Sequence, residues 1–457
     1  MSARPARASW SGPAVAAVSG LAGKGVQFLA LTALALVVSP AQFGLFSLVQ
    51  ALVFGVASLS ASAFAVSAAS STARRRDVAV GAGTTSAPDG VLDAVGHSLR
   101  GRRRWFALVA LVDGVVVAVG LAFVYGHPEQ AGVAFVIGAA AAGITVTDTV
   151  VGTLAGAGRT VATAVIDASR GLAGGLLAVV GGLAGGALGA ASGLVVLDAS
   201  IALVALVVTA WRGSAVRRDR PMPGTEEAGV ASSAPPRVSE AASDAERTRH
   251  DRRVTLTGVS AASLGQIAPW VLLWSLQAVG GLEAVATFGV ANRFAALVLL
   301  VPVYLGKNLV GRLVVDPATG RSVLRADVFV AWVGGVCVLA AVAAGAVQWF
   351  ALGPLAERYP GVAAVGVVLL AAAVVRGTAT SLSMVCAARG RLAAWVLSDV
   401  AATVVSVSLC VLAAVSTAAG DAEYLLYLSV PAGAIACALV RGASLMGSNR
   451  SSKVNKQ

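Results

Sequence analysis

The chain has 457 residues, of which 57% are hydrophobic and only 12% are charged, and its mean hydropathy is +0.83. Soluble domains have about a quarter charged residues, so this composition excludes a soluble globular protein and indicates a membrane protein. The net charge of +12 does not indicate a nucleic-acid partner, because arginine and lysine fall in every second loop, as membrane orientation alone produces.

Twelve apolar runs are each long enough to cross the roughly 30 Å of hydrocarbon in a bilayer as a helix. The first six are 12–38, 44–70, 105–125, 131–154, 160–183 and 186–210. The other six are 254–279, 285–306, 327–351, 361–386, 392–416 and 422–443. The first run follows basic residues, as in a signal peptide, but it is too long for the apolar part of one, and further runs follow at once. We therefore expect it to remain as the first of twelve transmembrane helices.

A polar segment at 212–252 interrupts the apolar pattern. It is rich in proline, serine, glutamate and arginine, and such a segment cannot bury enough apolar surface to fold. The sequence therefore predicts an all-α polytopic membrane protein with two six-helix bundles, at 1–211 and 253–443. A disordered cytoplasmic linker at 212–252 joins the bundles, and 444–457 form a cytoplasmic tail.

The basic residues predict the orientation of the helices. They occur in the linker, in the tail and in the loops after the second, fourth, eighth and tenth runs, whereas the opposite loops contain a single basic residue, Arg358. Both termini and the linker should therefore be cytoplasmic, with the chain in the plasma membrane. Within the basic loop at 73–104, Val91, Leu92, Val95 and Leu99 share one helical face, which predicts a short interfacial helix.

The two halves of the chain resemble each other. Arg159 matches Arg391 and Asp167 matches Asp399 at one offset of 232, and Gly44 matches Gly289 at an offset of 245. Each half has an even number of runs and begins on the same side, so the repeats are parallel. A transporter with this symmetry binds its substrate in the cleft between the halves.

Two cations at membrane depth are the main candidates for binding. An ionisable side chain in hydrocarbon costs several kcal/mol, so Lys24 and Arg293 should face a cavity or a partner. Neither has a carboxylate within one helical turn, and both should border the cleft, where they would attract a phosphate or another anion. The alternative is a cross-helix ion pair or snorkelling to the interface. Candidate substrate contacts are Lys24, Arg293, Arg376, Gln27 and Asn292, with Gln50 and Gln266 as weaker ones.

The carboxylates within the apolar runs have two interpretations. Asp167 and Arg170 are three residues apart and can pair on one helix, Asp148 can join them, and Arg376 with Asp399 would form the equivalent pair in the second half. Alternatively, Asp148, Asp167 and Asp399 bind a coupling proton or sodium ion. Asp113 and Asp198 are the other carboxylates within the runs.

No motif of an enzyme, cofactor or metal site is present in the sequence. It has no Walker A loop, no HExxH motif and no Gly-x-Ser-x-Gly elbow with partners. The four cysteines lie in apolar runs without CxxC or Cys/His spacing, so we expect neither a disulfide nor a metal. The sequence therefore predicts a protein that is not an enzyme and holds no cofactor.

The chain resembles the multidrug/oligosaccharidyl-lipid/polysaccharide (MOP) exporter superfamily, and within it the polysaccharide and O-antigen flippases. The resemblance rests on GLAGKGVQFLALTALALVVSPAQFGLFSLVQAL at 20–52, on TFGVANRFAALVLLVPVYLGKNLVGRL at 287–313, and on the Gly-Arg after the fourth and tenth runs. It implies a V-shaped bundle whose cationic central cavity opens alternately to each side and moves polyprenyl-pyrophosphate-linked oligosaccharides across the plasma membrane. Lys24 and Arg293 match the basic cavity residues of the family. Membrane lipids and the glycosyltransferases or polymerase of the pathway would be partners.

The sequence departs from the family in two respects, and other functions stay open. Lipid II flippases of the superfamily usually have two further helices, and the linker is unusually long.

A cation-coupled multidrug or metabolite antiporter of the same superfamily would depend on the carboxylates. A non-transporting scaffold of an envelope-assembly machine is a further alternative. A major-facilitator carrier should have a Gly-x-x-x-Asp-Arg-x-Gly-Arg loop after the second helix, and ARRRD at 73–77 does not match it.

Overall fold

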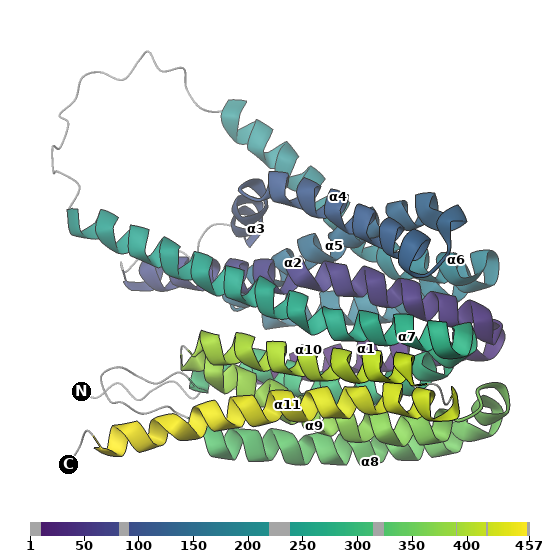
Figure 1. Ribbon diagram of the computed structural model, residues 1–457. Coiled ribbons are helices and arrows are strands. Elements are labelled where there is room, and N and C mark those ends of the chain that lie inside the picture. Colours follow the sequence, from purple (N-terminus) through teal and green to yellow (C-terminus); the bar gives the residue numbers. More distant parts are fainter. Residues whose placement is uncertain are drawn as a thin grey trace, which may run out of the picture.

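The computed structural model describes residues 11–81, 91–218, 238–313, 324–389, 391–416 and 419–454, and every regular element in these ranges is helical (Figure 1). The first half contains α1 (Ser11–Val37), α2 (Pro40–Gly81), α3 (Val91–Arg100), α4 (Arg103–Val119), the π-helical end η1 (Gly120–Val124), the 3-10 turn η2 (Pro128–Gln130), α5 (Ala131–Gly156) and α6 (Thr160–Arg218). The second half contains α7 (Val238–Leu313), α8 (Ala326–Arg358), α9 (Val362–Ala388), α10 (Leu392–Val415) and α11 (Ala419–Val454).

Two of these helices each contain two membrane crossings. Ten helical segments in the described ranges are long and apolar enough to span a bilayer, but α6 and α7 are interrupted by non-helical glycines. The breaks lie at Gly185–Gly186, where Gly186 has φ +60°, and at Gly281, with φ +67°. Glycine adopts such left-handed conformations without a Cβ clash, so a chain reversal needs no long loop. The eight uninterrupted segments and the two hairpins give the twelve predicted crossings.

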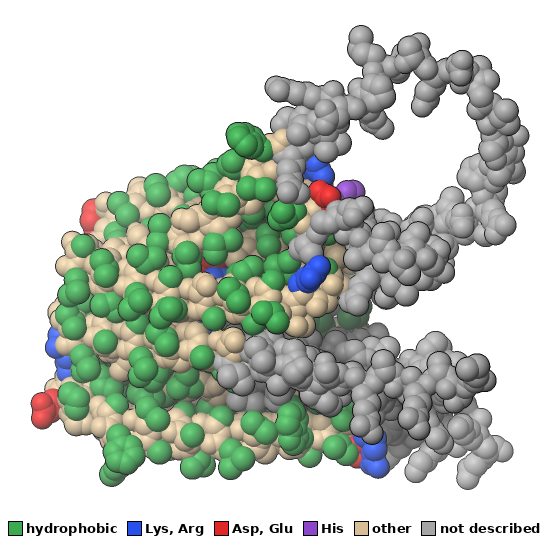
Figure 2. Space-filling model, turned by 180° about the vertical axis from the view of Figure 1, so that it is seen from behind, with side chains coloured by type: hydrophobic (Ala, Val, Ile, Leu, Met, Phe, Trp, Pro, Cys, Tyr) green, Lys and Arg blue, Asp and Glu red, His purple; other side chains and the backbone are tan. Residues whose placement is uncertain are grey.

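The helices form two six-helix bundles arranged as a V, as the sequence predicted. Both described chain ends, the end of α6 and the start of α7 lie at the same end of the molecule, which we call the inner end (Figure 1). The α1–α2 and α8–α9 turns lie at the opposite, outer end. Figure 2 shows apolar side chains over the flank of both bundles and charged side chains mainly at the two ends. An apolar flank between charged ends is what a bilayer requires, and the chain is a multi-pass membrane protein.

The internal repeat is visible in the backbone. The amide of Arg159 donates to the carbonyl oxygen of Leu154 at 2.8 Å, and the amide of Arg391 donates to that of Cys386, also at 2.8 Å. The donor and the acceptor of the second bond each lie 232 positions after those of the first, and 232 is the offset between the two halves in the sequence. The α5–α6 and α9–α10 turns therefore share this hydrogen bond.

The predicted interfacial helix forms as α3, but its apolar face packs inside the protein. Val95 and Leu99 are buried in a cluster with Phe106 and residues of α5 and α6, whereas Leu92 stays exposed. The helix is therefore part of the first bundle and does not lie on lipid with that face. The linker residues 219–237 and the side chains of Lys307 and of the arginines at 74–76 lie outside the described part of the chain.

Candidate functional site

A pocket of about 460 Å³ lies between the two halves and is lined by α1, α2 and α7. Its size is within the range of small-molecule sites, which is about 300–1,000 Å³. Along α2 it is lined by Ser47, Gln50, Phe54 and Ser58, which share one helix face and together extend about 16 Å, at about 1.5 Å per residue. The predicted contacts Lys24, Gln27, Asn292 and Arg293 all line this pocket, with Gln50 and Gln266, and Arg376 does not.

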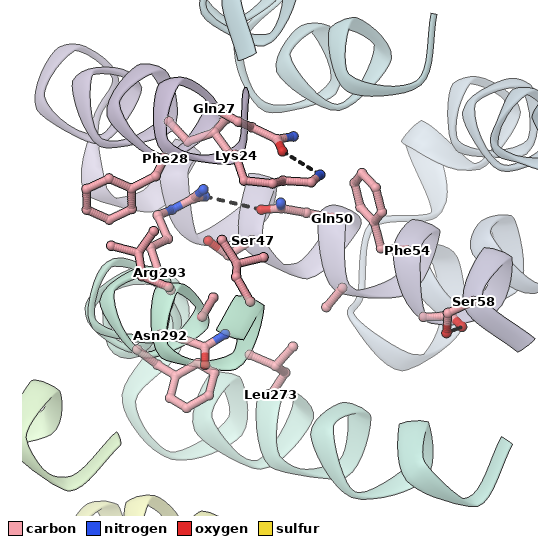
Figure 3. A pocket seen from close by; sticks show the side chains of 18 of the residues that line it. Lys24, Gln27, Phe28, Ser47, Gln50, Phe54, Ser58, Leu273, Asn292 and Arg293 are labelled. Atoms are coloured by element: carbon pink, nitrogen blue, oxygen red, sulfur yellow. Dashed lines mark hydrogen bonds between the residues drawn. The ribbon is translucent and has the colours of Figure 1, made fainter. Parts of the chain in front are cut away.

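Arg293 lies in the pocket, and no carboxylate of the described residues pairs with it. Its Nη2 donates to Oε1 of Gln50 at 3.2 Å (Figure 3), and its guanidinium carbon lies 4.8 Å and 5.4 Å from the ring centroids of Phe43 and Phe46. Its buried Nε has no hydrogen-bond partner. Aromatic faces attract a cation but leave its net charge uncompensated. The site therefore holds a positive charge that an anion can neutralise.

Lys24 is the second cation of the pocket. Its Nζ donates to Oε1 of Gln27 at 2.8 Å, and Figure 3 shows both side chains of α1 facing Gln50 of α2. No described residue forms a salt bridge with Lys24, so two of its three ammonium donors are available to a ligand. An ion pair across helices was the alternative prediction for both cations. Among the described residues, neither Lys24 nor Arg293 forms one.

Three carboxylates of the first half, Asp148, Asp167 and Asp198, surround Arg170, next to Lys24. Arg170 Nη1 lies 2.5 Å from Asp148 Oδ1 and 3.9 Å from Asp167 Oδ1, and its Nε lies 2.6 Å from Asp198 Oδ1. The expected group of Asp148, Asp167 and Arg170 is confirmed, and Asp198 from the second crossing of α6 completes it. We call these four residues the Arg170 cluster.

In the second half, Asp399 pairs with Arg441 and not with Arg376, so this expected pair was wrong. Arg441 of α11 is buried, and its guanidinium donates to Asp399 Oδ1 at 2.7 Å, to Ser398 Oγ at 2.8 Å and to the Ala379 carbonyl at 2.7 Å. Three acceptors from α9 and α10 thus bind the Arg441 guanidinium. Arg376 is exposed, and no described residue pairs with its guanidinium.

The pocket also contains residues that were not predicted from the sequence: the aromatic pair Phe43 and Phe46 beside Arg293, and the serines Ser47 and Ser58. The spacing of Ser47, Gln50, Phe54 and Ser58 at three and four residues along α2 is a helical-face signal that could have found the pocket wall. The contact of Phe43 and Phe46 with Arg293 joins residues of different halves, and no local pattern encodes it.

Hydrogen bonds between the halves close the outer end. Arg358, the last residue of α8, donates to the carbonyl oxygens of Leu36 at 2.7 Å and Val38 at 2.5 Å, and the hydroxyl of Tyr359, which follows α8, donates to that of Ala35 at 2.6 Å. These carbonyls end α1, where the helix lacks its own donors and carries partial negative charge. Burial raises the pKa of Tyr359 to about 12, so its hydroxyl keeps its proton and remains a donor. The outer end is closed in this conformation.

The comparisons with known proteins identify the fold. No protein-family model and no curated protein matches the sequence. The structure of a MATE protein in complex with MaD3S is similar with a TM-score of 0.59 at 16% identity, covering 98% of this chain and 97% of that chain. The outward-facing conformation of a multidrug resistance MATE family transporter of the MOP superfamily gives 0.57 at 18% identity, covering 98% and 96%. The structure of the MATE multidrug transporter DinF-BH gives 0.58 at 14%, covering 98% of both chains. The chain therefore has the fold of MATE transporters.

Proposed function

We propose that the protein exports an anionic, lipid-linked oligosaccharide across the plasma membrane by alternating access. The substrate would be a polyprenyl-pyrophosphate-linked polysaccharide precursor, bound through its pyrophosphate. The single observation that carries the proposal is the charge of the pocket: two cations, Lys24 and Arg293, and no carboxylate line it. Guanidinium and ammonium groups are the usual protein ligands of phosphate oxygens.

The walls of the pocket suit an amphiphile with a charged headgroup. Lys24, Gln27, Gln50 and Arg293 form a polar part at which a pyrophosphate and its first sugar can bind. An apolar part lies beside it, made by Phe28, Leu31, Phe54, Leu273, Phe288 and Leu297. In the proposed cycle, the headgroup enters while the outer end is closed by Arg358, and rocking of the two halves then exposes it outside.

A second candidate is a cation-coupled multidrug antiporter. Two of the similar structures are described as multidrug transporters, and the Arg170 cluster supplies carboxylates at membrane depth. Two features weigh against this candidate: the carboxylates are already paired with Arg170, and the pocket charge would repel a cationic drug. The sign of the transported charge therefore separates the two functions.

Transport by the full-length protein in liposomes tests the proposal. We expect a fluorescent polyprenyl diphosphate carrying one sugar to cross the bilayer with the wild type, and transport to fall at least tenfold in the Lys24→Gln/Arg293→Gln double variant. Arg325→Gln is the matched control, because Arg325 is exposed and, among the described residues, pairs with Asp327 two positions along. Equal transport by the wild type and the double variant would refute the proposal. Efflux of a permanently cationic dye driven by a proton or sodium gradient would establish the antiporter instead.

A further inference from the structure

Arg376 is a cation at membrane depth outside the pocket. It lies in the crossing Val362–Cys386 of α9. The helix starts near the outer end, so Arg376 lies about 21 Å further in at about 1.5 Å per residue, within the roughly 30 Å of hydrocarbon. Among the residues that the structure describes, none forms a hydrogen bond or a salt bridge with its guanidinium. A charge at this depth is costly without a partner, so the position favours a bound counter-ion.

The face of α9 that carries Arg376 changes from buried to exposed at this residue. Val365, Leu369 and Ala373 precede it on the same face, at spacings of three or four, and all are buried. Val367 lies about two and a half turns away and therefore on the opposite face, where its exposed side chain meets lipid. Arg376 thus points away from lipid and toward the interior of the protein. Because it is exposed there, the interior opens at this depth toward the inner end.

The groups around Arg376 do not compensate its charge. Those that act on it are Asp399 of α10 and Arg441 of α11, with the thiol of Cys437. Asp399 Oδ1 already pairs with Arg441 Nη2 at 2.7 Å, so two guanidinium groups share one carboxylate. The charged groups of this region therefore leave an excess of one positive charge. The first bundle, by contrast, has three carboxylates around the guanidinium of Arg170.

The other described neighbours of Arg376 carry no charge. Gly377, the next residue, packs against α7 and α8, where a Cβ would lie 3.6 Å from Pro302 Cγ and 2.6 Å from Cys337 Sγ. On the inner side, the hydroxyl of Thr380 donates to the Arg376 carbonyl oxygen at 2.8 Å, so it bonds to the helix backbone and not to the guanidinium. An anion is therefore the partner that this position lacks among the described residues.

We propose that Arg376 binds a carboxylate or phosphate group at a second anion site, which lies in the second bundle and opens to the inner end. A guanidinium binds either group through two parallel hydrogen bonds. The pocket has two cations and suits a pyrophosphate, whereas a single cation suits a single acidic group. Two sources can supply this group: a free anion of the cytoplasm, or an acidic sugar of the transported oligosaccharide. The second source rests on the proposed function, and the first does not.

Charge-selective labelling of one cysteine tests the site. Thr380→Cys places a thiol one turn inward of Arg376, in a full-length protein that has alanine at its four native cysteines and is held in nanodiscs. The probes are an anionic and a cationic methanethiosulfonate, which carry a sulfonate and a trimethylammonium group. A positive charge about 6 Å away favours the anionic probe, so Arg376→Gln should lower the ratio of the anionic to the cationic labelling rate at least fivefold. Arg376→Lys keeps the charge and should keep the ratio.

Arg389→Gln is the matched control for the loss of charge. Arg389 is exposed and directly follows the same helix. It lies about 13 Å from position 380 along the helix axis, beyond the screening length of about 8 Å at physiological salt, so its loss should leave the ratio unchanged. A ratio that does not respond to Arg376→Gln, or a thiol that neither probe reaches, would overturn the inference.

Protection against labelling identifies the source of the anion. Glucuronate and phosphate are the free-anion probes, and polyprenyl diphosphates carrying an acidic or a neutral sugar are the lipid probes. Stronger protection by the acidic-sugar lipid than by the neutral one assigns the site to the substrate, and protection by glucuronate or phosphate without that difference assigns it to a free anion. If neither effect occurs, the inference is overturned, and this result needs no substitution of Arg376. The proposed function would then stand, because it depends on the transport defect of Lys24→Gln/Arg293→Gln.

Discussion

The guanidinium of Arg358 donates a hydrogen bond to the carbonyl oxygen of Leu36, 2.7 Å away, although the two residues are 322 positions apart in the chain. The bond joins the end of α8 in the second half to the end of α1 in the first. It has to break before the outer end can open. Two charge-assisted bonds from Arg358 and one bond from the Tyr359 hydroxyl join the halves at this end, so they favour the closed state.

We expect Arg358→Gln combined with Tyr359→Phe to shift the protein toward an outward-open state. Each lost hydrogen bond to a charged donor weakens the closed state by about 1.5–3 kcal/mol. A cysteine at Ser47, which lines the pocket, should then react at least several-fold faster with a membrane-impermeant maleimide added outside, in a background whose native cysteines are replaced by alanine. Arg325→Gln, at the inner start of α8, should leave the labelling rate unchanged. Equal rates in the double variant and the parent would mean that these bonds do not hold the outer end closed.

The partly buried Arg293 and the buried Arg441 should respond differently to substitution by methionine. Arg293→Met removes a cation that has no carboxylate partner, so the thermal unfolding temperature should stay the same or rise while anion binding is lost. Arg441→Met removes the ion-pair partner of the partly buried Asp399 and should cost about 3–5 kcal/mol. Thermal unfolding of both purified variants measures the difference. A large loss of stability in Arg293→Met would mean that Arg293 has a structural role.

The contact between α1 and α6 depends on the absence of side chains. Gly171→Ala would place a Cβ 2.3 Å from the Gly23 backbone, so the helices must separate, and we expect a loss of about 1–3 kcal/mol. Gly25→Ala on α1 meets nothing within 4 Å and should be neutral or slightly stabilising, because alanine favours helix. Unfolding temperatures in one detergent compare the two variants. Equal values would show that the helices tolerate a wider separation.

The orientation of the bundles can be tested by fusion proteins. The distribution of arginines predicts that the inner end faces the cytoplasm. A green fluorescent protein fused to the C-terminus should therefore fluoresce, and alkaline phosphatase at the same position should be inactive. The reverse pattern would invert the assignment of the inner and outer ends and the direction of transport.

The sequence alone determined the fold class and the positions of the crossings. Hydrocarbon thickness sets the length of a spanning helix, so the apolar runs were enough to predict twelve helices. The cost of charge in hydrocarbon also singled out Lys24 and Arg293, and Gln27 and Asn292 beside them, which all line one pocket. These features are local, or repeat at fixed intervals along the chain.

Only the tertiary structure decided which charges meet. Asp399 has Arg441 as its partner and not Arg376, Asp198 joins the Arg170 cluster, and Phe43 lies against Arg293. Arg376 and Asp399 are closer in sequence, but α11 brings Arg441 to Asp399. Such pairings depend on the rotation of each helix about its axis and on its depth relative to its neighbours. Packing of small residues between helices sets both quantities, and the spacing of residues along one helix does not contain them.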